Sequence, residues 1–260
     1  MAPLAGKGIL VTRPREQAAR LSQRLQAIGA RPIVFPTIEI APPADPTRLH
    51  AVVDRLGECD WAIFISPTAV AAAWPVVQSR LAAWPATLQV AAVGPASAQA
   101  LRQQGIAAVH APEQGADSEA LLALPELQQV QGQHIVIFRG EGGRELLAET
   151  LRARGARVEY AECYRRRRPS VDPAAILAAW RRGEIDAVTV TSSEGMQNLF
   201  ALLGEPGRAA LCATPLFAPH ERIAAAARAL GVKRVVVTAP GDEGLLTTLN
   251  EWFAHEQPQP

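Results

Sequence analysis

The sequence predicts an α/β protein with two doubly wound parallel-sheet domains, built from a swapped internal repeat and joined by two crossing segments with a cleft between them. Three observations predict this fold class. Short apolar runs alternate with helical patterns along the 260 residues, the two halves of the chain repeat one plan, and a proline-rich break interrupts the middle of each half. Clefts between domains are preferred ligand sites.

The repeat is visible in two aligned stretches, GILVTRPREQAARLSQRLQAIGARPIVFP and HIVIFRGEGGRELLAETLRARGARVEYAE. Gly29 matches Gly155, since 155 − 29 = 126, and Arg13 matches Arg139 at the same offset. The offset persists further along the chain in the pairs Asp60 and Asp186, Ser66 and Ser192, Gly105 and Gly231, and Gly115 and Gly241. Two halves of about equal length therefore share one plan.

Each half alternates strand and helix patterns. The first begins with the apolar run GILVT, and REQAARLSQRLQAIG follows with one apolar helical face, formed by Ala18, Leu21, Leu25 and Ile28. RPIVFP, DWAIFIS and QVAAVG are expected as strands, and PTAVAAAWPVV and ASAQALRQQG as helices. The second half places HIVIF, ARVEYAE, DAVTVTS, TPLFA and KRVVVTA at the corresponding points. Apolar strands separated by helices predict a parallel sheet that is covered on both faces.

The domain boundaries are expected inside the repeats. The breaks IAPPADP, at 40–46, and RRRRPSVDP, at 165–173, are equivalent, because 173 − 46 = 127. A break in the middle of both copies indicates swapped halves. We therefore expect a discontinuous domain of residues 1–37 and 172–260, a second domain of residues 44–165, and hinge crossings at 38–43 and 166–171.

Composition excludes several classes of function. A net charge of +1 gives no electrostatic footprint for nucleic acid. No apolar run approaches the ~18 residues of a membrane span and no secretory signal is visible, so we expect no membrane partner and a cytoplasmic location. The three cysteines and five histidines show neither a C-x-x-C motif nor metal-ligand spacing, so no metal site is predicted. A monomer is expected, because a cleft and a hinge account for the main features without an interface.

One stretch, residues 135–155, combines a strand, a glycine turn and a helix start, an arrangement that can hold an anion. It lacks the G-x-G-x-x-G and G-x-x-x-x-G-K-[ST] motifs of nucleotide sites, and Glu141 would repel a phosphate. The alternative is that Gly140 to Gly143 only make a turn and that Arg144 is a solvated residue of the first helical turn.

Six short motifs follow one another along the chain: VTRP, PTIEI, FISPTAV, AVGPASAQALRQQG, TSSEGM and APHERIAAAARALG. With the swapped repeat, they make essentially the whole chain resemble the uroporphyrinogen-III synthase family of tetrapyrrole biosynthesis. The resemblance implies that the substrate is hydroxymethylbilane, a linear tetrapyrrole with carboxylate arms. Hydroxymethylbilane synthase, which makes this substrate, is then a candidate for transient contact.

The resemblance also implies the chemistry. Loss of the substrate's hydroxyl gives an electrophilic azafulvene, and the far pyrrole ring attacks it through its already substituted carbon. The resulting spiro intermediate fragments and recloses with that ring inverted. Water is lost without a redox change, so no cofactor is expected, and the main task of the enzyme is to position a reactive chain.

Carboxylate arms favour arginine, whose planar fork binds a carboxylate bidentately. Under the resemblance, Arg144, its neighbours Arg139 and Gly140, and the counterpart Arg13 in TRPRE are candidate substrate contacts. Ligands bind at the carboxyl edge of an open α/β sheet, and further candidates stand where a strand ends and a helix begins: Ser66, Gly94, Ser192 and Ser193. Ser97, in VGPASAQ, matches a position of the resembled family that has a hydroxyl near the substrate. The alternative for the serines at strand ends is that they only cap helices.

Tyr164, in AECYRRRRP, matches the tyrosine of the family's return crossing, and its hydroxyl is a candidate proton donor to the leaving group. The alternative is a hinge tyrosine that packs on its strand neighbours. Where the family pattern often reads Gly-Pro-Thr, this chain has Ala218, Pro219 and His220, so His220 either replaces the threonine as a donor or caps a helix. Arg222 is either a carboxylate contact or a solvated residue.

Two alternatives concern the chain as a whole. The arginine run at 165–168 either steers an anionic substrate or is a solvated ladder on a strand. A non-catalytic bilobed binding protein or sensor for small anions fits the repeat and the cleft equally well.

Overall fold

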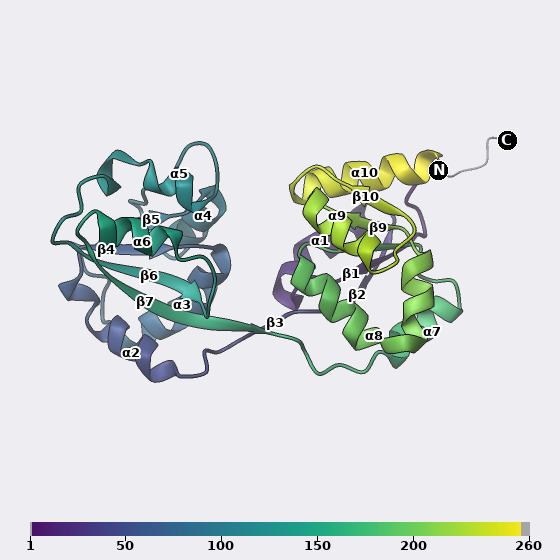
Figure 1. Ribbon diagram of the computed structural model, residues 1–260, viewed down its shortest axis with the longest axis horizontal. Coiled ribbons are helices and arrows are strands. Elements are labelled where there is room, and N and C mark those ends of the chain that lie inside the picture. The colour runs from purple at the N-terminus through teal and green to yellow at the C-terminus, as the bar shows by residue number, and fades with distance from the viewer. Residues whose placement is uncertain (1, 256–260) are drawn as a thin grey trace. The chain divides into compact units, whose positions relative to one another are not determined.

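The computed structural model describes residues 2–255, which form two compact units (Figure 1). The first unit contains the chain up to Glu39 and from Arg167 onward, and the second is Ile40–Arg166. Each unit therefore combines segments of both repeats. The predicted hinge at 38–43 and 166–171 stays a prediction.

The first unit has a five-stranded sheet in the order β10-β9-β8-β1-β2. All of its neighbouring strands run parallel. The strands are β1 (Gly8–Val11), β2 (Arg31–Val34), β8 (Ala187–Thr189), β9 (Leu216–Ala218) and β10 (Val235–Val237).

Helices cover both faces of this sheet because its central strand is apolar on both sides. Ile9 and Val11 pack with α1 (Arg15–Ala27) and α10 (Gly241–His255). Leu10 points to the opposite face and packs with the other three helices, α7 (Ala174–Arg181), α8 (Ser193–Ala213) and α9 (Glu221–Ala229). Successive strand residues alternate between faces, so a fully apolar strand requires a layer on each side.

The second unit has the sheet order β3-β7-β6-β4-β5, and β7, β6, β4 and β5 run parallel. Its strands are β3 (Glu39–Ala41), β4 (Trp61–Phe64), β5 (Gln89–Ala92), β6 (His134–Gly140) and β7 (Arg157–Arg167). One face packs against α2 (Pro46–Asp54), α3 (Pro67–Arg80) and α4 (Pro95–Gln103), with the 3-10 turn η1 (Leu56–Glu58). The other face packs against α5 (Ser118–Leu122), α6 (Leu146–Ala153) and the 3-10 turn η2 (Pro125–Leu127).

The swap is visible in the pairing of the central strands. In the first unit Ile9 of β1 pairs with Ala187 of β8, and in the second Ile135 of β6 pairs with Trp61 of β4. These are the same pairing made twice, since 135 − 9 = 126 and 187 − 61 = 126. The predicted fold class, two doubly wound parallel sheets from a swapped repeat, is confirmed.

One local expectation differs from the structure. Ile28 was expected on the buried face of the first helix, but α1 ends at Ala27, and Ile28, just beyond it, is 36% exposed.

The arginine run at 165–168 lies mostly in β7, which continues to Arg167. The Arg167 guanidinium binds Glu39 through two hydrogen bonds of 3.0 and 2.8 Å. This placement fits the alternative of a ladder on a strand.

Gly8 begins β1 at a point where the backbone leaves no room for a side chain. A Cβ there would lie 1.7 Å from the carbonyl oxygen of Glu184. We predict that Gly8→Ala lowers the free energy of unfolding by about 2–3 kcal/mol, because β1 must move to relieve the clash. Chemical denaturation measures this change.

The matched control is Gly57→Ala, where a Cβ would meet no heavy atom within 4 Å. That exposed change should stay within about 0.5 kcal/mol of wild type. Equal unfolding midpoints for the two variants would contradict the prediction.

Candidate functional site

The candidate residues gather at the carboxyl edges of the two sheets, where parallel α/β proteins bind ligands. Each unit has a cavity at this edge. The cavity in the second unit has a volume of about 250 Å³ and that in the first about 150 Å³.

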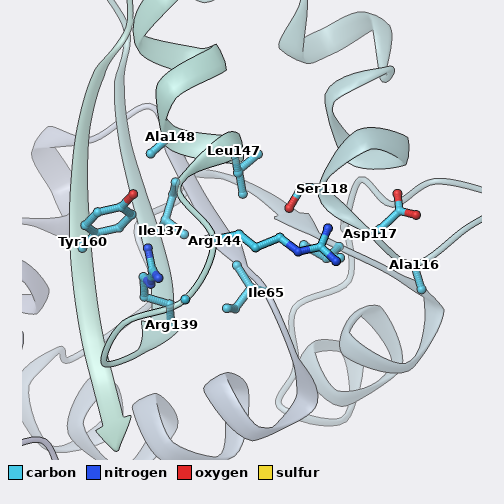
Figure 2. A pocket seen from close by; sticks show the side chains of 12 residues that line it. Ile65, Ala116, Asp117, Ser118, Ile137, Arg139, Arg144, Leu147, Ala148 and Tyr160 are labelled. Carbon is cyan, nitrogen blue, oxygen red and sulfur yellow. The ribbon is translucent and has the colours of Figure 1, made fainter. Parts of the chain in front are cut away.

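The cavity of the second unit has both apolar and polar lining residues (Figure 2). The apolar residues, here called the apolar floor, are Ile65, Val93, Ile137, Leu147 and Ala148, and the polar ones are Asp117, Ser118, Arg139, Arg144 and Tyr160. Figure 2 shows the Arg144 side chain extending toward Ser118 and Asp117, with Arg139 and Tyr160 on the opposite side. An apolar floor beside a cation suits an aliphatic arm that ends in a carboxylate.

Arg139 is buried, and each of its three guanidinium nitrogens donates a hydrogen bond within its own unit. Its Nη1 donates to Glu145 Oε1 at 3.0 Å and its Nε donates to the Gly140 carbonyl at 3.3 Å. Its Nη2 donates to the Gly142 carbonyl. The side chain is only 4% exposed, so Arg139 fixes the glycine turn rather than presenting a free guanidinium.

Tyr160 and Glu145 complete the surroundings of Arg139. The Tyr160 hydroxyl donates to Glu145 Oε2, and the guanidinium carbon of Arg139 lies 4.5 Å from the ring centroid. The hydrogen bond from Tyr160, followed by that from Arg139, lowers the pKa of Glu145. Burial, followed by the neighbouring Glu145 carboxylate, raises the pKa of Tyr160.

Arg144 is the accessible cation of this cavity. Its side chain is 74% exposed, and its Nη1 lies 3.6 Å from Glu119 Oε1, a distance typical of a weak surface pair. It was expected in the first helical turn, but α6 begins at Leu146 and Arg144 lies in the preceding loop. Glu141 is held elsewhere, because its Oε1 accepts from the Ala44 amide at 2.5 Å.

The cavity of the first unit is lined by Arg13 and His220, with Thr191, Thr238 and Gly241 nearby. The starts of α9 and α10 border it, and His220 occupies the N-cap position of α9 without a side-chain cap bond. Arg13 Nη1 lies 2.5 Å from Asp242 Oδ1, and the two side chains are 15% and 18% exposed. Arg222, on the exposed side of α9, does not line this cavity.

The strand-end serines cap helices. Ser66 Oγ accepts from the Ala69 amide at 3.1 Å, and Ser192 Oγ accepts from the Gly195 amide at 3.0 Å. Ser193 is the first residue of α8.

Gly94 and Ser97 occupy the start of α4. Gly94 is its N-cap, where a Cβ would lie 2.7 Å from the Ala116 side chain, and Ser97 is buried in the helix. Close packing accounts for both residues.

Tyr164 lies in the core of the second unit and is only 3% exposed. The register shifts between Arg139 and Gly140, so that Gly140 pairs with Tyr164 and Cys163 is left as a bulge. A Cβ on Gly140 would lie 2.7 Å from the Tyr164 ring, so this glycine allows the ring to lie against β6. Bulges often re-aim side chains near functional sites.

Two of the three cysteines, Cys59 and Cys163, are buried in the second unit. Burial raises the pKa of Cys163 to about 12 and that of Cys59 to about 11, so both thiols stay protonated near neutral pH. Among residues 2–255, no group of three or more histidine, cysteine, aspartate or glutamate side chains could hold a metal ion. No helix in that part of the chain is long and apolar enough to cross a membrane.

Sequence reasoning found the arginines but missed their carboxylate partners. Glu145 and Asp242 correspond to Ala19 and Ala116 in the other repeat, since 145 − 126 = 19 and 242 − 126 = 116. The repeat therefore gave no signal for either acid. Tyr160 was also missed, although it lies four residues before Tyr164 on the same strand.

The lowered pKa of Glu145 predicts how the stability of the fold depends on pH. A carboxylate with a depressed pKa stabilises the fold above its ordinary value of 4.5, and that stabilisation is lost as the pH falls through the folded-state value. Glu145→Gln should therefore melt below wild type at pH 6–7, with the difference shrinking below about pH 4.5.

Thermal melts between pH 3 and 7 measure the difference. Glu149→Gln, which removes an exposed carboxylate from the first turn of the helix that Glu145 precedes, is the matched control. A wild-type advantage over Glu145→Gln that stayed constant across this range would contradict the assignment.

Residues 19–247 match the family described as "Uroporphyrinogen-III synthase HemD". Uroporphyrinogen-III synthase of Escherichia coli is 36% identical over 92% of this chain and 97% of its own length, and that of Salmonella typhimurium gives the same values. A solved mutant uroporphyrinogen III synthase of Thermus thermophilus, 21% identical, shares the fold with a TM-score of 0.59 over 96% of this chain and all of its own. The chain belongs to the uroporphyrinogen-III synthase family.

Proposed function

We propose that the chain is a cofactor-independent lyase that cyclises hydroxymethylbilane to uroporphyrinogen III, with inversion of the terminal ring and loss of water. The observation that carries this proposal is the family match over residues 19–247, together with 36% identity to a relative across 92% of the chain. Both bacterial relatives are named uroporphyrinogen-III synthase, and the chain spans nearly their full length.

Positioning is the main catalytic contribution. After the hydroxyl leaves, the unassisted azafulvene closes to the uninverted ring, so the enzyme must hold the chain where the substituted carbon of the last ring attacks. Holding reacting atoms in a productive geometry removes an entropic barrier of up to ~7–11 kcal/mol. The enzyme can hold the substrate in this geometry through its carboxylate arms.

The two cavities contain groups that can bind these carboxylate arms. In the second unit, Arg144 offers an accessible guanidinium above the apolar floor of Ile65, Ile137 and Leu147. In the first unit, Arg13 and His220 line a smaller cavity at the start of two helices. Guanidinium groups and helix N-termini both favour carboxylates.

The proposal extends to the setting of the reaction. We place the enzyme in the cytoplasm as a monomer that meets hydroxymethylbilane synthase transiently, because a substrate that closes spontaneously is best transferred quickly. No cofactor enters this mechanism, since the reaction loses water and changes no oxidation state.

One experiment separates this enzyme from a non-catalytic anion-binding protein. Freshly made hydroxymethylbilane is mixed with the protein, the products are oxidised, and the porphyrin isomers are separated. The inverted isomer should dominate. If the uninverted isomer dominates as it does without protein, the enzyme proposal is wrong.

Arg144→Ala should weaken substrate binding more than it slows chemistry. Because the guanidinium is 74% exposed, we expect KM to rise about threefold to tenfold, corresponding to ~0.7–1.4 kcal/mol, with a smaller change in kcat. Steady-state kinetics measure both constants. Arg102→Ala, in the last turn of α4, removes an exposed arginine that lines neither cavity and is the control. An unchanged KM in Arg144→Ala would contradict this prediction.

Tyr164→Phe distinguishes a proton donor from a packing residue. If the hydroxyl assists the leaving group, turnover should fall roughly tenfold to a few hundredfold, or about 1.4–3.4 kcal/mol of barrier, while the ring keeps the core filled. The uninverted isomer should rise, because a slowed enzyme lets more substrate close unaided. Rate, isomer ratio and melting temperature are measured together.

Tyr164→Ala provides the comparison. Removing a buried ring should cost about 3–5 kcal/mol of stability. A wild-type rate in Tyr164→Phe, with a lowered melting temperature only in Tyr164→Ala, would remove the hydroxyl from the chemistry.

A further inference from the structure

The two arginines that are equivalent in the repeat differ in how their hydrogen-bond donors are satisfied. Arg139 donates from Nε, Nη1 and Nη2 to three acceptors of its own turn and helix start. Arg13 donates to Asp242 through Nη1, and its Nε is buried without a hydrogen-bond acceptor within residues 2–255. A buried donor without an acceptor is uncommon and calls for a physical explanation.

The surroundings of Arg13 favour an anion. Arg13 lines a cavity of about 150 Å³ that is bordered by the starts of α9, nine residues long, and α10, fifteen residues long. His220 lines the same cavity, and its side chain makes no cap bond to α9. The backbone amides at these starts and the guanidinium attract a carboxylate from different elements.

Asp242 supplies a carboxylate from within the protein. It lies in the first turn of α10 and reaches Arg13 at 2.5 Å. Its position in the other repeat holds Ala116, so this pair is not part of the shared plan of the two units. Arg13 and Asp242 are joined by one hydrogen bond, from Nη1 to Oδ1, whereas an arginine can bind a carboxylate through two parallel bonds.

We propose that the Arg13 cavity binds one carboxylate arm of the substrate and that Asp242 occupies Arg13 as an internal competitor until that arm displaces it. Arg139, by contrast, is a structural residue. The identity of the ligand rests on the proposed function, while the existence of a carboxylate site does not.

Such a competitor provides selectivity. A lone small carboxylate must displace Asp242 with a single contact and binds weakly. A ligand with several carboxylate arms, anchored elsewhere, presents its arm at a high effective concentration and displaces Asp242 readily. Selection against weak competitors is a recognised route to specificity.

A direct test follows the arginine Nε–H signals of the full-length protein by NMR, with propionate as the probe and sodium chloride at equal ionic strength as the control. Arg13→Gln and Arg139→Gln identify the two signals. The titration is made in Arg144→Ala protein, which lacks the accessible cation of the other cavity. Propionate should then shift the Arg13 signal and leave the Arg139 signal in place. No shift of the Arg13 signal, or an equal shift of both signals in this variant, would overturn the proposal.

Asp242→Asn tests the competition. Removing the internal carboxylate should tighten propionate binding about tenfold, since one charge-assisted contact no longer has to be displaced. In the Arg13→Gln background the same change should give no gain, which isolates the coupling between the two residues. Glu145→Gln breaks the ion pair of the other unit and should leave propionate binding at Arg13, followed by the Arg13 signal, as in wild type.

Folding and function are checked separately. Melting temperatures identify a variant that fails to fold, and the titration of Arg144→Ala protein needs no variant at Asp242. Unchanged or weaker propionate binding by a folded Asp242→Asn protein would refute the competitor role. If wild type binds propionate at Arg13 but yields only the uninverted isomer, the proposed function fails and the carboxylate site stands.

Discussion

The pairing of central strands from opposite repeats is the constraint on which the rest of the structure depends. β1 joins β8 in the first unit and β6 joins β4 in the second, so neither repeat can complete a sheet alone. An aspartate fixes the start of each central strand: Asp186 Oδ2 accepts from the Gly8 amide, and Asp60 Oδ2 accepts from the His134 amide, both at 2.7 Å. The same two contacts, 126 residues apart, set the register that places an arginine at each carboxyl edge.

From this shared frame the two edges have diverged. Arg139 is enclosed by the carbonyls of its glycine turn and by Glu145, which leaves Arg144 as the accessible cation of the cavity in the second unit. Arg13 has no such turn, because Pro14 and the start of α1 at Arg15 follow it directly. The first unit therefore keeps an arginine whose donors are only partly used. In our proposal, one repeated position has a structural role in one unit and a recognition role in the other.

The fold could be predicted from the sequence because burial on both faces forces apolar runs such as Ile9 to Val11, and these runs recur at a constant offset. The site could be predicted only in part. Arg13 and Arg139 stand at equivalent strand ends, but their partners Asp242 and Glu145 come from non-equivalent positions and have no signal in the pattern. The sequence also did not show which face of the sheet Tyr164 occupies. A bulge at Cys163 breaks the alternation of side chains from which that face would be inferred.

Asp242 lies beside Arg13 because a mostly buried guanidinium needs a negative partner when no ligand is bound. A guanidinium as enclosed as Arg13, at 15% exposure, would leave an uncompensated charge in the empty protein, and such a charge is strongly destabilising. In our proposal, Asp242 removes that cost and yields to a ligand carboxylate, so the arm bound at Arg13 contributes only the difference between two carboxylates. A substrate with several arms tolerates this exchange, because many modest contacts together fix its shape. Catalysis by positioning depends on that shape, so a protein of this kind can do without one very strong binding group.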